Sequence, residues 1–256
     1  MKLRTLNLAA FNSLTKYPSI PTYHPLDPEK RGVLMDPPVP FAGEVILTEK
    51  VDGTNTRIVC LPDGDFVIGS RGEFLHARGD LIHNPALGIV DAVRDAAEHI
   101  VGSESFEHVT VFYGEVFGGR VTRASPQYTS DRAVSFRLFD VAVFPDAEAR
   151  LHMSNEAIAG WREDGGQAFV GEERLATLAR SLDLKLAPRI DVVSTMPSSI
   201  EQAHAFLEAR LPATRCALDE DAGGSPEGLV VRTPDRSRIA KLRFADYTRT
   251  QKKKRR

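Results

Sequence analysis

The chain has 256 residues, of which 42% are hydrophobic and 27% are charged, so it is long enough for one large or two small globular domains. Its formal net charge of −2 gives no global signal for a polyanionic partner, and nucleic-acid binding would need a local basic surface. Two distant cysteines, Cys60 and Cys216, favour a reducing cytoplasm over a disulfide framework, and no apolar run is long enough to cross a bilayer.

The N-terminal part of the chain predicts an irregular arm followed by strands. Residues 18–40 are rich in proline and indicate a surface arm without regular structure. Apolar and β-branched residues predict strands over 44–49, 56–61 and 66–70, and the turn signal at 62–65 makes the last two a hairpin.

The rest of the chain predicts helices and further strands. Apolar residues at helical spacing predict helices over 84–100, with Asn84 as a cap, and over 152–163, 172–182 and 199–211. β-branched and aromatic residues predict strands over 108–117, 134–144, 227–233 and 238–244. We therefore expect an α+β fold of antiparallel sheets with flanking helices.

One short motif, "TEKVDGTNTRI" from Thr48 to Ile58, indicates chemistry. Lys50 falls at the end of a predicted strand, and Gly53 permits a tight bend and the close approach of a ligand. A free lysine has a pKa near 10.4, so a nucleophilic Lys50 would need burial or nearby cations to lower that pKa. Lys241 and Arg243, which alternate on one face of the last predicted strand, could supply the cations. Taken alone, the motif also fits a surface turn.

Five further motifs follow in order: "SRGEFL", "YGEVFG", "FRLFDV", "EGLVVR" and "AKLRF". With "EKVDGTN", the set resembles the covalent nucleotidyltransferase superfamily of ATP-dependent ligases and mRNA capping enzymes. It is most similar to the RNA ligase 2 family, because "KYPSI" precedes it, Asn55 replaces a usual arginine, and only thirteen residues follow Arg243. The resemblance implies an adenylyltransferase (ATP-grasp-like ligase) domain over 1–250, no C-terminal OB domain, and a basic tail over 251–256.

The resemblance also implies roles for ten residues. Lys50 would attack the α-phosphate of ATP, and Glu49 would accept a hydrogen bond from the adenine amino group. Lys241 and Arg243 would stabilise charge on the phosphate, and Glu227 would be a catalytic, metal-associated carboxylate. Nucleotide contacts are expected from Asn55 and Arg71 to the sugar-phosphate, Glu115 to the ribose, Phe139 to the adenine face and Lys241 to the α-phosphate, and Asp140 is expected to help hold the metal.

The implied cofactors are ATP and Mg²⁺ or Mn²⁺, and the implied substrate is RNA with 5′-phosphate and 3′-hydroxyl ends, including nicked duplexes. Asp52 stands where histidine is usual, as in the DNA ligase pattern, which keeps DNA nick sealing open; Arg243 stands where a second lysine is usual. A capping-type guanylyltransferase and a non-catalytic nucleotide- or RNA-end-binding module also stay open. No helical C-terminal domain is seen, so either the enzyme is minimal or a protein partner replaces that domain. The tail "QKKKRR" is either a frayed, solvated end or an RNA contact.

Overall fold

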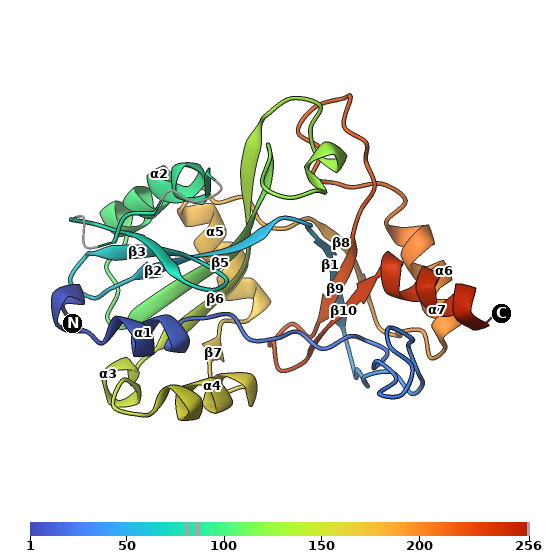
Figure 1. The fold of residues 1–256 in the computed structure, drawn as a ribbon, viewed down its shortest axis with the longest axis horizontal. Helices are drawn as coiled ribbons and strands as arrows, with labels where there is room; N and C mark the ends of the chain where they lie inside the picture. The colour runs from blue at the N-terminus through green and yellow to red at the C-terminus, as the bar shows by residue number, and fades with distance from the viewer. Residues whose placement is uncertain (80–81, 85–87, 255–256) are drawn as a thin grey trace. The chain divides into compact units, whose positions relative to one another are not determined.

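The computed structural model describes residues 1–79, 82–84 and 88–254, and the chain divides into two compact units (Figure 1). Unit 1 comprises Met1–Ser19, Gly53–Arg123 and Ala133–Leu186, and unit 2 comprises Ile20–Asp52, Ala124–Arg132 and Ala187–Arg256. Each unit therefore combines segments that are distant in the sequence, and each has its own antiparallel sheet.

Unit 1 contains a six-stranded antiparallel sheet in the order β4-β3-β2-β5-β6-β7. The strands are β2 (Thr54–Cys60), β3 (Phe66–Ser70), β4 (Phe74–Ala77), β5 (Val109–Gly118), β6 (Val134–Phe144) and β7 (Ala168–Phe169). Helices cover both faces: α2 (Ile89–Ser103) and α5 (Glu172–Ser181) lie on one face, and α1 (Leu8–Leu14), α3 (Ala147–Arg150) and α4 (Asn155–Glu163) lie on the other (Figure 1).

The alternation of β2 explains the two cores of unit 1. Ile58 and Cys60 belong to the core beneath α2 and α5, whereas Val59 and Leu61 belong to the core beneath α1, α3 and α4. Successive side chains of a strand point to opposite faces, so a strand that is apolar at every position is buried on both sides. We call these two faces of the sheet the α2 face and the α1 face.

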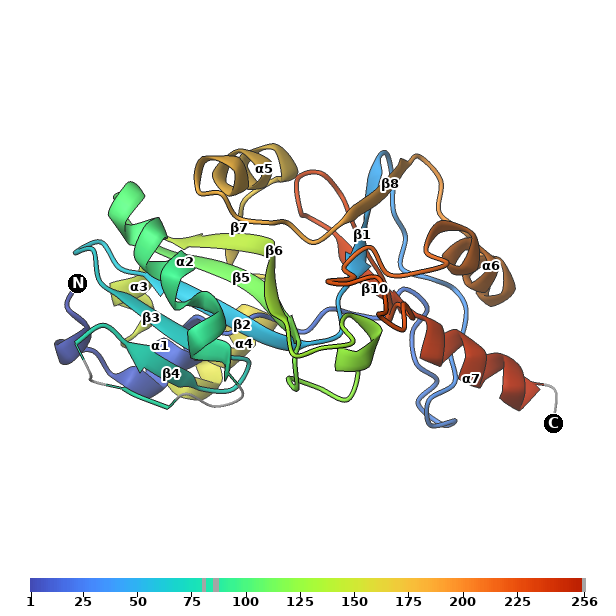
Figure 2. The same cartoon turned by 90° about the horizontal axis from the view of Figure 1, so that it is seen from above.

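Unit 2 contains a four-stranded antiparallel sheet in the order β10-β9-β1-β8. The strands are β1 (Val45–Lys50), β8 (Arg189–Val193), β9 (Gly228–Arg232) and β10 (Ile239–Arg243). The core on one face includes residues of α6 (Ile200–Arg210), α7 (Phe244–Lys254) and the arm before β1. Helices α6 and α7 lie side by side (Figure 2).

The predicted α+β fold of antiparallel sheets with flanking helices is confirmed, and most predicted strands agree with the structure within a few residues. The helix predicted over 84–100 begins instead at Ile89 with Gly88 as its cap. Asn84 donates its N–H to Leu75 O and so belongs to the β4 region; residues 85–87 of that prediction lie outside the described residues. Helices α1, α3 and α7 and strands β4, β7 and β8 were not predicted.

Two short 3-10 helices, Leu3–Thr5 and Ser125–Gln127, are also present among the described residues. Within the described part of the chain, no helix combines the length and the apolar character that a membrane span requires.

Candidate active site

Lys50 is the last residue of β1, and it points away from the core of unit 2. Val45 and Leu47 of β1 are in that core, so by alternation Thr48 and Lys50 lie on the opposite, open face of the sheet. Leu229 and Val231 of β9, like Ala240 and Leu242 of β10, are core residues, so Lys241 and Arg243 share the open face with Lys50.

The register of the three strands aligns these cations around a glycine. Lys50 is paired with Gly228 of β9, and Gly228 is paired with Arg243 of β10. With strands about 4.8 Å apart, the Cα atoms of Lys50 and Arg243 are about 10 Å apart, separated by a residue without a side chain. Gly228 has φ +155°, and a Cβ there would collide with Leu242 O. The sequence motif "EGLVVR" thus requires its glycine for close strand packing.

The immediate partner of Lys50 is a carboxylate. Its Nζ donates to Glu227 Oε2 at 2.5 Å, in a partly buried pair formed by residues 177 positions apart. Burial raises the pKa of Glu227, more than the attraction of Lys50 lowers it, and the negative charge of Asp52 raises it further. Glu227 is therefore a carboxylate that accepts a proton more readily than usual, placed against the amine of Lys50.

Arg243, the last residue of β10, is bound by a residue of the helix α7 that follows it. Its Nε and Nη2 donate to the two carboxylate oxygens of Asp246, at 2.7 and 3.1 Å. A bidentate pair of this kind fixes the plane of the guanidinium. Lys241 is diagonal to Lys50 in the register, opposite Val230, and its carbonyl accepts from Tyr23 N at 2.9 Å.

Glu49 lies beside Lys50 in the sequence but on the other face of the strand. It is only 2% exposed, and its carboxylate accepts hydrogen bonds from Thr214 Oγ1 and from Arg215 N, the latter at 2.7 Å. Thr214 Oγ1 also accepts from Cys216 N at 3.0 Å. The buried carboxylate is thus held by the segment 214–216, which sequence reasoning did not single out because it has no periodic pattern.

The turn that follows Lys50 is anchored on a tyrosine. Asp52 N donates to Tyr128 Oη at 2.7 Å, and Tyr128 is fully buried, which raises the pKa of its phenol. Tyr128 comes from the loop between β5 and β6, for which the sequence predicted no element. The hydrogen bond fixes the backbone two residues after the candidate nucleophile.

The other predicted site residues belong to unit 1. Asn55 of β2 is paired with Glu115 of β5, and both fall on the α1 face by alternation from Val59 and Tyr113. Glu115 Oε1 accepts from Gly53 N at 3.2 Å, so the carboxylate fixes the start of β2. Gly53 has no room for a side chain, since a Cβ would collide with Val116 O.

Phe139 and Asp140 are consecutive residues of β6, yet both lie on the α1 face, because the pairing of β6 with β5 is interrupted at this point. Tyr113 is paired with Asp140 but Gly114 with Leu138, which leaves Phe139 as an extra residue, a β-bulge. Phe139 packs into the α1-face core, edge-on to Tyr17 at 5.0 Å between ring centroids. Tyr17 Oη donates to Asp140 Oδ2 at 2.6 Å.

Arg71 lies in the exposed turn between β3 and β4. The turn is ordered by Ser70 Oγ, which accepts from Gly72 N and Glu73 N at 3.2 Å each, and by Asn12 of α1, whose Nδ2 donates to Gly72 O at 3.0 Å. The guanidinium is thus presented from a structured turn, as an arginine that grips a phosphate would be.

Sequence reasoning missed a buried arginine, Arg57, on the α1 face of the sheet. Arg57 of β2 is fully buried, its Nη2 donates to Asn12 Oδ1, and its guanidinium lies over the ring of Phe74 at 5.0 Å. Its Nε and Nη1 have no hydrogen-bond partner among the described residues. Burial lowers the pKa of Arg57 to about 10, and the nearby Arg162 adds to the effect. An arginine in the middle of an apolar strand pattern was the available signal.

We name two groups of predicted residues by unit. The nucleophile group of unit 2 is Glu49, Lys50, Glu227, Lys241 and Arg243, and the sheet group of unit 1 is Asn55, Arg71, Glu115, Phe139 and Asp140. The register of unit 2 brings Lys50, Glu227, Lys241 and Arg243 together. The register of unit 1 brings Asn55 to Glu115, whereas Arg71 is on a separate turn.

The carboxylates of unit 2 suit a divalent cation that also takes ligands from a substrate. Across residues 1–79, 82–84 and 88–254, no three His, Cys, Asp or Glu side chains are clustered as a metal site. Asp52 lies near enough to Glu227 to raise its pKa, so two carboxylates are available there. Mg²⁺ commonly uses one or two carboxylates, several waters and phosphate oxygens, so this donor set fits it without a complete protein cage.

The comparisons with known proteins agree with this fold. Residues 43–244 match a family model described as RNA ligase. The structure is similar to Naegleria gruberi RNA ligase with PPi, with a TM-score of 0.59 and 15% identity over 94% of this chain and 59% of that chain. A mutant with AMP and Mn gives 0.58 and 16% over 95% and 59%, and a mutant with ATP and Mn gives 0.54 and 15% over 84% and 52%. No curated protein matches the chain.

The fold is thus the mixed α/β fold of RNA ligases, which confirms the predicted fold class. Because the family model covers most of the sequence, the chain belongs to the RNA ligase family. It spans between about half and two thirds of the Naegleria chains that it resembles.

Proposed function

We propose that this chain is an ATP-dependent RNA ligase, of the RNA ligase 2 type, that carries AMP on Lys50. The observation that supports the proposal most directly is the contact between Lys50 Nζ and Glu227 Oε2 at 2.5 Å, on an open sheet face that also carries Lys241 and Arg243. A solvated lysine has no need of a partly buried acceptor or of two cations on the same face of the sheet. Membership in the RNA ligase family gives the arrangement its chemical meaning.

In the first step, neutral Lys50 Nζ attacks the α-phosphorus of ATP. The N–P bond forms, the bond from the α-phosphorus to the bridging oxygen breaks, and pyrophosphate leaves with the electron pair. Glu227, whose pKa is raised, is placed to take the proton that Nζ loses. Lys241 and Arg243 lie on the same face, where they would stabilise the negative charge that develops on the phosphoryl oxygens.

The second and third steps transfer the adenylate and then replace it. An oxygen of the RNA 5′-phosphate attacks the lysyl-AMP phosphorus, which forms the 5′–5′ pyrophosphate linkage and returns the electron pair to Lys50 Nζ. The 3′-hydroxyl oxygen then attacks the 5′-phosphate phosphorus, so that AMP leaves and the hydroxyl proton passes to solvent or a nearby base. Glu227 with help from Asp52 would hold Mg²⁺ or Mn²⁺, which would neutralise phosphate charge; Asp140, in unit 1, is assigned separately as a candidate metal ligand.

The remaining residues are assigned to binding. Glu49, whose carboxylate is positioned by Thr214 and Arg215, is assigned to the adenine amino group. Glu115 and Phe139 are assigned to the ribose and to the adenine face, where stacking is worth about 1–3 kcal/mol per base. Asn55 and Arg71 are assigned to the sugar-phosphate and to the 5′-phosphate of the RNA.

The test is self-adenylylation of the protein. The chain is incubated with α-³²P-ATP and Mg²⁺ or Mn²⁺, and acid-labile label on the protein is measured by gel. We expect label on the wild type and on the control Lys185→Ala, an exposed lysine of unit 1, and none on Lys50→Ala. Absence of label on the wild type, or label that survives Lys50→Ala, would refute the proposal. GTP in place of ATP tests for a capping-type guanylyltransferase.

DNA nick sealing is the second candidate, because Asp52 stands where the RNA ligase 2 type usually has histidine. Nicked duplexes that differ only in RNA or DNA on the 3′-hydroxyl side separate the two. Sealing that requires RNA at that position supports the RNA ligase, and equal sealing of an all-DNA nick supports the DNA ligase. Sealing by this chain alone would show that it needs no protein partner for ligation.

A further inference from the structure

The helix α7 is firmly held on one side and open on the other. On the held side, Tyr247 Oη lies 2.8 Å from His24 Nδ1, and Thr250 Oγ1 accepts from Leu34 N at 2.9 Å. Tyr247 and Thr250 are fully buried. The arm before β1 therefore fixes the helix in unit 2, so its other side is presented in a defined orientation.

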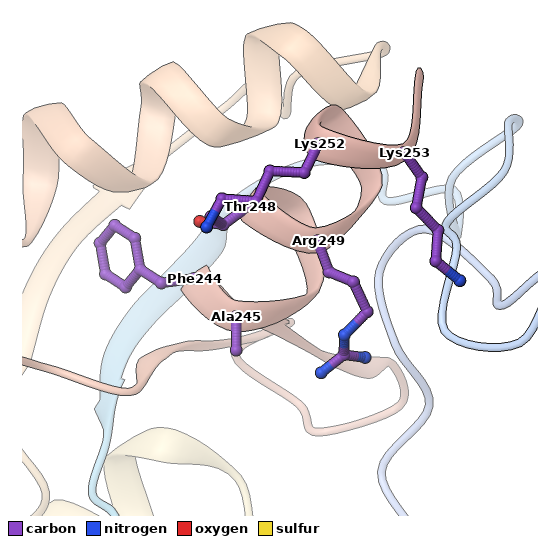
Figure 3. Close-up of a pocket in the computed structure, with 6 residues that line it drawn as sticks. All are labelled: Phe244, Ala245, Thr248, Arg249, Lys252 and Lys253. Carbon is purple, nitrogen blue, oxygen red and sulfur yellow. The ribbon is translucent and has the colours of Figure 1, made fainter. Parts of the chain in front are cut away.

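The open side of α7 lines a hollow of about 430 Å³ and is basic (Figure 3). Arg249, Lys252 and Lys253 line it together with the smaller residues Ala245 and Thr248, and Phe244 lies at one end. Lys252 extends along the helix toward Thr248, and Arg249 points to the same side as Ala245 (Figure 3). None of the residues that line the hollow is acidic. We call Arg249, Lys252 and Lys253 the α7 basic face.

The charge of this face is compensated only in part. Asp246 is the only acidic residue in α7. It is bound more closely by Arg243 than by Arg249, whose Nη1 lies 3.5 Å from Asp246 Oδ1. Lys253 Nζ donates to the carbonyl of Arg31 at 2.7 Å, a neutral partner that leaves the positive charge in place. No hydrogen bond or ion pair of Lys252 is found among the described residues. Since the chain as a whole has a net charge of −2, the excess is local.

We propose that the α7 basic face binds the phosphate backbone of the RNA substrate. The inference rests on the proposed function, and it names a contact that the nucleophile group and the sheet group do not supply. Exposed cations beside small residues allow phosphates to approach closely, and a single aromatic at the margin is too little apolar surface for a protein partner. The charge complementarity selects a polyanion.

The position of the face along the chain sets where on the RNA it acts. α7 begins directly after Arg243, and residues 249–253 lie about 9–15 Å further along the helix axis, at 1.5 Å per residue. At about 3.4 Å per nucleotide of a strand, this length corresponds to about three to four nucleotides. The phosphates contacted are therefore expected to be a few nucleotides from the RNA 5′-phosphate that reacts with the adenylate on Lys50.

The test compares two triple variants with the same loss of charge. Arg249→Gln/Lys252→Gln/Lys253→Gln removes the α7 basic face while keeping good helix formers. Lys2→Gln/Arg4→Gln/Arg174→Gln removes three exposed cations of unit 1. Binding of a fluorescent, 5′-phosphorylated nicked RNA duplex is followed by anisotropy over a range of salt concentrations, without ATP. Vesicles that contain phosphatidylserine are a second probe.

We expect the α7 variant to bind the duplex at least about tenfold more weakly at low salt. The plot of log K against log salt should become less steep: the magnitude of its negative slope should decrease by about two to three, because each lost phosphate contact removes about 0.9 from it. Unchanged affinity and slope, an equal loss in the unit 1 variant, or wild-type binding to vesicles as tight as to RNA would each overturn the proposal.

Self-adenylylation without RNA separates this proposal from the proposed function. The α7 variant is expected to be labelled by α-³²P-ATP, because none of its three residues is in the nucleophile group or the sheet group. A wild type that binds RNA through α7 but takes no label would refute the ligase and leave the RNA surface standing. If the wild type takes label but the α7 variant binds RNA as tightly as the wild type, the proposed RNA surface is refuted and the ligase proposal stands.

Discussion

Lys50 Nζ and Glu227 Oε2 lie 2.5 Å apart, although 177 residues separate them in the chain. The contact exists because β9 pairs with β1 in the register that places Gly228 opposite Lys50. The residue before the strand then delivers its carboxylate to the amine. We expect both the stability of unit 2 and the proposed self-adenylylation to depend on the contact between Lys50 and Glu227.

Replacement of Glu227 by Gln is expected to raise stability while it abolishes activity. Burial holds the pKa of Glu227 above its ordinary value of 4.5, so the folded chain binds that proton more tightly than the unfolded chain does. The contribution of Glu227 to stability therefore falls as the pH rises from 4.5 through the raised pKa, and it is lowest above it. Glu227→Gln should melt at a higher temperature than the wild type at about pH 8, and the gain should shrink toward about pH 4. Thermal melts across this range check the sign.

A melting temperature below that of the wild type at every pH would show that the Lys50–Glu227 pair is a net stabiliser. Self-adenylylation of the same variant, measured at equal folded concentration, supplies the functional half of the test.

Gly228→Ala is expected to unfold or severely weaken unit 2. The residue has φ +155°, and a Cβ would meet Leu242 O, so the strain and the displaced strand together should cost at least about 1–3 kcal/mol. Gly102→Ala is the matched control, since Gly102 lies in α2 with nothing within 4 Å of the place that a Cβ would take, and should be neutral or slightly stabilising. Urea unfolding measures both; equal stabilities would contradict the packing argument.

Tyr128→Phe is expected to slow adenylylation as well as lower stability. The change leaves Asp52 N without its acceptor, at a cost of about 1–3 kcal/mol if the group stays buried. The turn after Lys50 loses its anchor, so the rate of label incorporation should fall even at saturating ATP. Tyr23→Phe, which loses a comparable hydrogen bond to Pro197 O at 2.6 Å, should lose stability but keep the rate per folded molecule.

Arg57→Met is expected to stabilise unit 1. The guanidinium is fully buried with two nitrogens unpaired, and its pKa is lowered to about 10, so the charged form is held at a cost at every pH below that value. A methionine of similar length should raise the free energy of unfolding by about 1–4 kcal/mol near neutral pH, as replacement of buried ionic groups often does. A loss of stability would instead mean that the contacts with Asn12 and Phe74 outweigh the desolvation.

Sequence patterns predicted strands better than they predicted the partners of single residues. Alternation was enough to place Lys50 at a strand end and to put Lys241 and Arg243 on one face. It could not reveal that Thr214 and Arg215 hold Glu49, because those residues come from a segment without periodicity and 165 or more positions away. The polar sequence of α7 concealed a helix that is held in place by the contacts of its residues Tyr247 and Thr250 with the arm.

The bulge in β6 has a consequence for how relatives of this chain should be aligned. The two halves of that strand on either side of Phe139 are out of phase by one residue, so a comparison that assumes a single alternation will exchange inward and outward positions in one half. Loss of one amino acid from this short stretch would restore a regular ladder and turn the aromatic ring and the neighbouring acid to opposite surfaces. Homologues that preserve the extra residue should therefore preserve both side chains together.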